Sequence, residues 1–103
     1  MIQPGHFVVL TLQDPREQIW GVLRAMDQRG VTVEGLSVEL FDSWLQDMGA
    51  GGDSMQHLSL VFYPMLRVER VLLDRGAPGM PSLAERAEKR LGRPLANFLA
   101  SDA

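Results

Sequence analysis

The chain has 103 residues, of which 46% are hydrophobic and 22% are charged, so it can form one small globular core and is not a disordered tail. It contains no cysteine, which excludes disulfides, thiol nucleophiles and cysteine metal sites. The formal net charge of −3 argues against a general nucleic-acid binder, because phosphate contacts give that class a basic footprint.

The first ten residues carry no positively charged region ahead of an apolar stretch, so we expect no signal peptide. No apolar run approaches the roughly 20 residues that a membrane-spanning helix needs. Together with the lack of cysteine, this pattern predicts a cytoplasmic location.

The N-terminal part of the chain predicts a strand followed by a hairpin. Residues 6–14 (HFVVLTLQD) are rich in β-branched and apolar types and end in a turn at Asp14-Pro15. Residues 17–28 have some helical spacing, but a glycine inside a helix, here Gly21, costs about 1 kcal/mol. The turn-like DQRG at 27–30 and the alternation of residues 31–40 favour two strands joined by a tight turn.

In the middle of the chain the spacing of the apolar residues changes twice, from alternating to helical and back. Residues 40–48 (LFDSWLQDM) have apolar positions at helical spacing and predict one or two helical turns, and GAGGDS at 49–54 predicts a loop. Two further strands are predicted at 57–63 and 66–74, with an abrupt corner at Pro64. On the second of these strands we expect Arg67 and Glu69 to share one face and Arg70 to take the other.

The C-terminal part predicts a linker at 75–81 and then a helix. Ser82 and Glu85 form a capping box in front of LAERAEKRL, and Gly92 is placed to end that helix. A second short helix is predicted from Pro94 onward, with Leu95, Phe98 and Leu99 as its apolar residues.

The predicted fold class is therefore mainly β: a small bent barrel of five strands with a short helix between the third and fourth strands and a helix at the C-terminus. We divide the chain into a barrel at 1–75 and a linker with a helical extension at 76–103.

The strand plan resembles the Sm-like superfamily, which includes the Lsm proteins and bacterial Hfq and has an SH3-like barrel. Its first motif is matched by residues 19–23 (IWGVL), then Asp27, then the alternating residues 31–33 (VTV). Its second motif, two short strands meeting at a corner, is matched by LVFYPMLRVERVLL at 60–73. The resemblance covers residues 7–74. It implies a homo-oligomeric ring in which the fourth strand of one subunit pairs with the fifth strand of the next.

The resemblance also implies candidate RNA contacts. These are Asp27, Gln28 and Arg29 in the hairpin turn, with Tyr63 to stack on a base and Arg67 to meet a phosphate at the corner. RNA-binding members usually carry an Asn after the motif Asp and Arg-Gly or Lys-His near the corner. This chain has Gln28-Arg29-Gly30 and Tyr63-Pro64-Met65 instead, which ranks RNA binding second.

Motifs for catalysis and metal binding are weak. His6 and His57 are the only histidines, and the pair Asp53 and His57 lies in a glycine-rich context that does not favour a helix. GAGGDS lacks the Lys-Ser/Thr of a phosphate-binding loop, and no G-x-S-x-G occurs. We expect no catalytic residues, no metal and no cofactor. We expect Trp20 to pack in the core and Trp44 to cover a neighbouring subunit.

Three functions follow in order. The first is a non-enzymatic, oligomeric Sm-like interaction module that binds itself and an unidentified protein, with no membrane partner. The second is an RNA-binding protein of the Sm/Hfq type. The third is a small ligand-binding barrel, which no motif supports.

Overall fold

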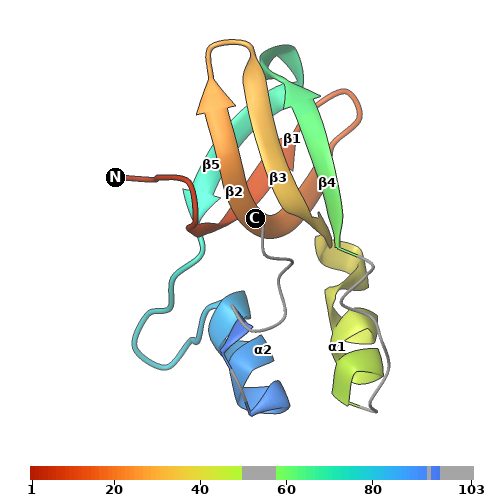
Figure 1. Ribbon diagram of the computed structural model, residues 1–103, viewed down its shortest axis with the longest axis vertical. Coiled ribbons are helices and arrows are strands. Elements are labelled where there is room, and N and C mark those ends of the chain that lie inside the picture. The colour runs from red at the N-terminus through yellow and green to blue at the C-terminus, as the bar shows by residue number, and fades with distance from the viewer. Residues whose placement is uncertain (50–57, 93, 96–103) are drawn as a thin grey trace.

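The computed structural model of the protein describes residues 1–49, 58–92 and 94–95. In these ranges five antiparallel strands form one sheet in the order β4-β3-β2-β1-β5. The strands are β1 (Phe7–Leu12), β2 (Glu17–Asp27), β3 (Gly30–Ser37), β4 (Ser59–Pro64) and β5 (Val68–Leu73). The sheet curls into a small barrel-like shape (Figure 1). The predicted fold class is confirmed.

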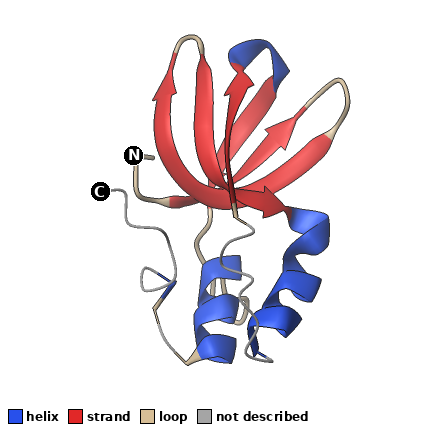
Figure 2. Ribbon diagram, turned by 45° about the vertical axis from the view of Figure 1, so that its right-hand side comes forward, coloured by secondary structure: helices blue, strands red, loops and turns tan. Residues whose placement is uncertain are grey.

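Two helices lie at one end of the sheet (Figure 2). A 3-10 turn, η1 (Val38–Leu40), and the helix α1 (Phe41–Gly49) follow β3, while α2 (Leu83–Leu91) comes after β5. The predicted capping box is confirmed, because the Ser82 hydroxyl accepts from the Glu85 N–H and the Glu85 carboxylate accepts from the Ser82 N–H. Gly92 ends α2 with a positive φ of 74°. The loop predicted at 49–54 starts one residue too early, because Gly49 still belongs to α1. The rest of that loop and most of the helix predicted from Pro94 fall outside the described residues.

The sheet has two buried faces. The inner face carries one apolar cluster, made of Val8, Leu10, Leu12, Ile19, Leu23, Val31 and Val33. The outer face, on which Trp20 lies, is covered at one end by the helices through a second cluster that includes Phe41, Trp44, Leu45, Met48 and Ala87. The alternation of apolar residues along β1 and β2 therefore serves two cores at once, since successive strand residues point to opposite faces.

The two tryptophans lie together in the outer cluster. Trp20 is fully buried, with its ring centroid 5.2 Å from Phe7 and 5.1 Å from Phe41, so its predicted packing role is confirmed. The expectation that Trp44 covers a neighbouring subunit is wrong. Its ring lies 5.7 Å from Trp20, and only 5% of the residue is exposed, because α1 folds back onto the sheet of its own chain.

β2 and β3 approach each other most closely at a pair of glycines. Gly21 lies opposite Gly35 in the sheet register. A Cβ atom on Gly21 would overlap the Glu34 carbonyl oxygen and lie 2.6 Å from the Gly35 Cα. Only a residue without a side chain therefore fits at this point on either strand.

The corner after β4 differs from the prediction. β4 ends at Pro64, and a 3-10 turn, η3 (Met65–Arg67), comes before β5. Arg67 therefore lies outside the strand, and the prediction that it shares a strand face with Glu69 is wrong. The chain reverses direction at Pro64, and the reversal needs a turn of backbone before the next strand can start. The alternation of side chains along the sequence does not reveal that turn. The predicted strand start at His57 lies outside the described residues.

Candidate functional site

The first candidate surface is the free edge of β4. Within the described residues β4 pairs only with β3, so one side of its backbone has no partner strand. Leu60 and Phe62 lie opposite Glu34 and Thr32 on the outer face, and they are 66% and 54% exposed. The strand sequence, SLVFYP, has no charged residue. An uncharged edge with exposed apolar side chains is the kind of surface that pairs with another strand.

The Glu34 carboxylate beside this edge is paired within its own sheet. Glu34, opposite Leu60, accepts two hydrogen bonds from the Arg24 guanidinium, at 3.0 Å and 2.6 Å. Both side chains are largely shielded from solvent. The charge directly opposite Leu60 is therefore paired.

The Phe62 ring has a fixed position on this face. A Cβ atom on Gly30 would lie 2.5 Å from Cζ of Phe62, so the ring sits directly over the glycine backbone. One side of the ring packs on Gly30, and the rest is exposed. No sequence pattern indicated this contact, because it depends on the pairing of Gly30 with Pro64 across β3 and β4.

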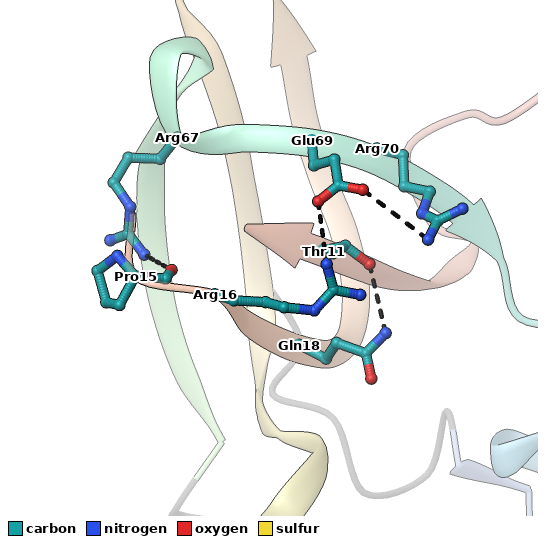
Figure 3. Close-up of polar contacts among 7 residues, drawn as sticks. All are labelled: Thr11, Pro15, Arg16, Gln18, Arg67, Glu69 and Arg70. Atoms are coloured by element: carbon teal, nitrogen blue, oxygen red, sulfur yellow. Dashed lines mark hydrogen bonds and ion pairs between the residues drawn. The ribbon is translucent and has the colours of Figure 1, made fainter. Parts of the chain in front are cut away.

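The second candidate surface is the edge of β5, at the opposite end of the strand order, where no further strand pairs among residues 1–49, 58–92 and 94–95. β5 pairs with β1, and Leu72 and Arg70 lie opposite Val9 and Thr11 on the outer face. Leu72 is 48% exposed. Glu69 lies where the β1–β5 register shifts, and it pairs with Arg16 at 3.3 Å and more loosely with Arg70 at 3.9 Å (Figure 3).

Arg67, a predicted RNA contact, is engaged inside the molecule. Its guanidinium donates to the Gln13 and Pro15 carbonyl oxygens, each at 2.9 Å, and lies 3.3 Å from the Glu17 carboxylate. Figure 3 shows the side chain reaching from the corner after β4 to the β1–β2 turn. Arg67 therefore holds that turn, and its donors point at protein acceptors.

The hairpin turn between β2 and β3 holds the other three polar candidates. The Asp27 carboxylate accepts from the Arg29 N–H at 2.7 Å and from the Gly30 N–H at 3.3 Å. The Arg29 hydrogen bond is the main cause that lowers the pKa of Asp27 below its usual value. Gln28 is exposed, and the Arg29 side chain is 84% exposed. The Arg29 carbonyl accepts from the Met65 N–H at 2.8 Å, so this turn and the β4–β5 corner lie side by side.

Tyr63 belongs to the inner face. It lies opposite Val31 and packs partly against the inner cluster. Burial raises the pKa of Tyr63, the Glu17 carboxylate raises it further, and the Arg67 guanidinium lowers it. Thus the structure groups Asp27, Gln28 and Arg29 at the turn and Tyr63 near Arg67 at the corner, and Tyr63 does not present a fully open ring for stacking.

A hollow of about 290 Å³ opens on the inner face beside β4. Its apolar walls include Ile19, Val33 and Val61. Gly35, Ser37 and Ser59 also line it, and their small side chains leave the space open. No sequence motif indicated this hollow, since it depends on which small residues the register brings together.

Among residues 1–49, 58–92 and 94–95, no group of three or more metal-binding side chains gathers. Over the same part of the chain, no helix is both long and apolar enough to cross a membrane.

Comparisons with protein-family models, with curated proteins and with solved structures found no match.

Proposed function

We propose that this chain is a non-enzymatic, Sm-like interaction module that assembles with copies of itself into a closed ring, β4 of one copy pairing with β5 of the next. The observation that carries the proposal is the pair of free edges on one sheet, both with apolar side chains exposed on the outer face. The motif resemblance in residues 7–74 supports the same assembly.

Head-to-tail pairing suits these two edges. A contact between two different surfaces of the same chain leaves one of each free on every dimer, so it continues until a ring closes or a filament grows. A strongly curved sheet favours closure. Fully burying a Leu or Phe side chain stabilises by about 1.5–3 kcal/mol, and the partly exposed Leu60, Phe62 and Leu72 each have some of that stabilisation still to gain.

The test is the mass of the protein in solution. We expect light scattering and native mass spectrometry at micromolar concentration to find one discrete oligomer, whose mass gives the ring size. Leu60→Asp introduces a charge on the β4 edge and should lower the mass. Met80→Asp is the matched control, because Met80 is similarly exposed, at 70%, but belongs to neither edge strand and lies between β5 and α2 in the chain. A wild-type monomer would refute the assembly.

RNA binding is the second candidate, and the contact between the Arg29 carbonyl and the Met65 N–H supports it. In a ring, the exposed Arg29 of every subunit would lie near the corner between β4 and β5. Electrostatic binding would fall with salt, with a log–log slope near 0.7 for each phosphate contact on a single strand. We expect labelled uridine-rich and adenine-rich oligonucleotides to bind only at low salt.

The matched variants are Arg29→Ala and Arg90→Ala, since both arginines are exposed but only Arg29 lies at the hairpin turn. Arg67→Ala is unsuitable because it would release the β1–β2 turn. Submicromolar binding at physiological salt that is lost in Arg29→Ala alone would rank RNA binding ahead of the interaction module.

A further inference from the structure

We infer that the seam between two copies is antiparallel and has one register, with Leu60 of β4 opposite Leu72 of the second copy's β5 and Phe62 opposite Arg70. This inference rests on the proposed self-association and adds which side chains meet across the contact. Three independent features of the edges select this register: the faces, the lengths and the side-chain chemistry.

The first feature is the face on which each side chain lies. Leu60 and Phe62 are on the outer face of β4, and Arg70 and Leu72 are on the outer face of β5. A sheet that continues across two copies keeps outer residues beside outer residues. A slip of one residue would instead set the exposed Leu60 beside Val71, which packs against the inner cluster.

The second feature is length. Both strands have six residues, and full antiparallel overlap sets Ser59 opposite Leu73 and Pro64 opposite Val68. Over residues 59–62 and 70–73 that overlap also satisfies the matching of faces. Beyond them the register shift between β1 and β5 puts Val68 on the inner face, opposite Pro64 on the outer face. A slip of two residues in one direction sets Leu60 beside Arg70, and in the other direction beside Asp74. Either slip shortens the ladder and pairs a leucine with a charge.

The third feature is the chemistry of the pairs. The regular part of β5 is residues 70–73, because the register with β1 shifts next to Glu69. In the inferred register these four residues meet residues 59–62. Leu60 and Leu72 form an apolar pair, while the Arg70 guanidinium, held only at 3.9 Å by Glu69, lies beside the exposed Phe62 ring.

The inner face agrees with the same register. Val61 meets Val71, and Ser59 meets Leu73. Ser59 and Val61 line the 290 Å³ hollow, so the second copy's strand adds apolar contacts at the rim of a space that the small residues leave open.

Two other pairings are possible for the same exposed residues, but each pairs them less favourably or leaves one of them exposed. A parallel seam would set Leu60 beside Arg70 and Phe62 beside Leu72, and parallel pairing is slightly less stable per residue. A two-fold seam between two β4 strands, centred on Val61, would set Leu60 beside Phe62 but would leave Leu72 exposed and the β5 edge unpaired.

Cysteine cross-linking distinguishes these pairings, because the wild-type chain has no cysteine. Directly opposite residues in an antiparallel ladder have Cα atoms about 4.5–5.5 Å apart, which lies within the range for a disulfide, whereas diagonal neighbours are farther apart. The test variant is Leu60→Cys with Leu72→Cys. The matched control is Phe62→Cys with Leu72→Cys, and Val61→Cys alone reports the two-fold seam.

After mild oxidation we expect the first double variant to give covalent multimers on a non-reducing denaturing gel, and the other two variants to stay monomeric there. A second pair, Phe62→Cys with Arg70→Cys, tests the same register if the first fails to fold, which circular dichroism would report. Cross-linking of the control pair alone would overturn the register in favour of a parallel or slipped seam. A Val61→Cys dimer alone would establish the two-fold seam instead.

Failure of this inference is separable from failure of the proposed function. If the wild-type chain is monomeric by light scattering, self-association itself is refuted. If the wild-type chain is a discrete oligomer but neither Leu60/Leu72 nor Phe62/Arg70 cysteine pairs cross-link between copies, self-association holds and the inferred register is wrong.

Discussion

At the scale of single residues, the glycine pair of β2 and β3 sets the shape of the sheet. Gly21 and Gly35 lie opposite each other, and a Cβ atom on either would run into the backbone of the facing strand. The contact is with backbone atoms, which cannot swing aside as a side chain would. Because the backbones of β2 and β3 approach so closely here, the two strands can curve together.

We predict that Gly21→Val lowers the free energy of unfolding by about 1–3 kcal/mol or more, the usual cost of overpacking. Urea denaturation followed by tryptophan fluorescence measures it. Ala25→Val is the control, because Ala25 is on the same strand but exposed. Equal stability of wild type and Gly21→Val would contradict the close approach of the two strands.

Tyr63 permits a second test at this scale, because it is the only tyrosine in the chain. Burial, and then the Glu17 carboxylate, raise the pKa of its hydroxyl above 10.0, the ordinary value. We predict that absorbance titration near 295 nm gives a midpoint above 10 and that Glu17→Gln moves it down.

The sign of the linked stability follows from that direction. The folded chain holds the Tyr63 proton more tightly than the unfolded chain. The stability that this group contributes is therefore present below the unfolded pKa of about 10 and is lost as pH rises from there through the raised pKa of the folded chain. A wild-type midpoint at or below 10 would show that the ring is open to solvent and available for stacking.

At the scale of elements, the sequence was most informative where one local rule decides the outcome. The capping box at Ser82, the left-handed Gly92 and the hairpin turn at Gln28–Arg29 depend on neighbours within a few positions, and the structure has all three. The strand predicted through residue 40 ended early at Ser37, because Val38–Leu40 already turn toward α1.

What the sequence could not show depends on contacts between distant residues. Arg67 looked like a strand residue with a free charge, but its partners Gln13 and Pro15 lie more than 50 positions away and are brought near only by the fold. Phe62 over Gly30 and the hollow beside β4 have the same origin. The strands could therefore be predicted from the sequence, whereas the candidate surfaces could be identified only from the register of the sheet.

Asp74 joins three elements and was not singled out from the sequence. One carboxylate oxygen accepts from the Trp20 indole N–H at 3.0 Å and from the Ala84 N–H at 2.9 Å, and the other accepts from the Leu83 N–H at 3.0 Å. It therefore connects the end of β5 to β2 and to the N-terminal end of α2, where a negative charge is favourable.

We predict that Asp74→Ala destabilises the chain by about 1–3 kcal/mol, because it leaves the indole donor of the buried Trp20 and the first N–H groups of α2 without this acceptor. Thermal unfolding by circular dichroism measures the loss. Asp47→Ala is the control, since Asp47 is exposed on α1. An unchanged melting temperature in Asp74→Ala would show that α2 docks through its apolar residues alone.

At the scale of the whole molecule, the two free edges lie at opposite ends of one strand order, so the chain has a head and a tail. Each edge can be blocked by itself. Leu60→Asp introduces a charge on the β4 edge and leaves β5 intact, while Leu72→Asp does the reverse. Both leucines are about half exposed or more, at 66% and 48%, so neither change opens a core.

We predict that each of these variants alone is monomeric and that an equimolar mixture forms a 1:1 complex. In the mixture, the intact β4 of Leu72→Asp meets the intact β5 of Leu60→Asp, and growth stops there because the two introduced aspartates block the outer ends. The complex has a single seam without the gain in effective concentration that ring closure supplies, so it needs a higher protein concentration than the wild-type ring. Light scattering measures the mass of the mixture, which is compared with the mass of each variant alone.

The alternatives give different masses in the same experiment. A two-fold seam between β4 strands predicts that Leu72→Asp still forms a dimer by itself, because its β4 edge is intact, and that adding Leu60→Asp produces no new complex. A chain whose edges do not pair predicts monomers in every sample, wild type included. Only a head-to-tail contact makes two non-associating variants restore one another, because each then supplies the surface that the other lacks.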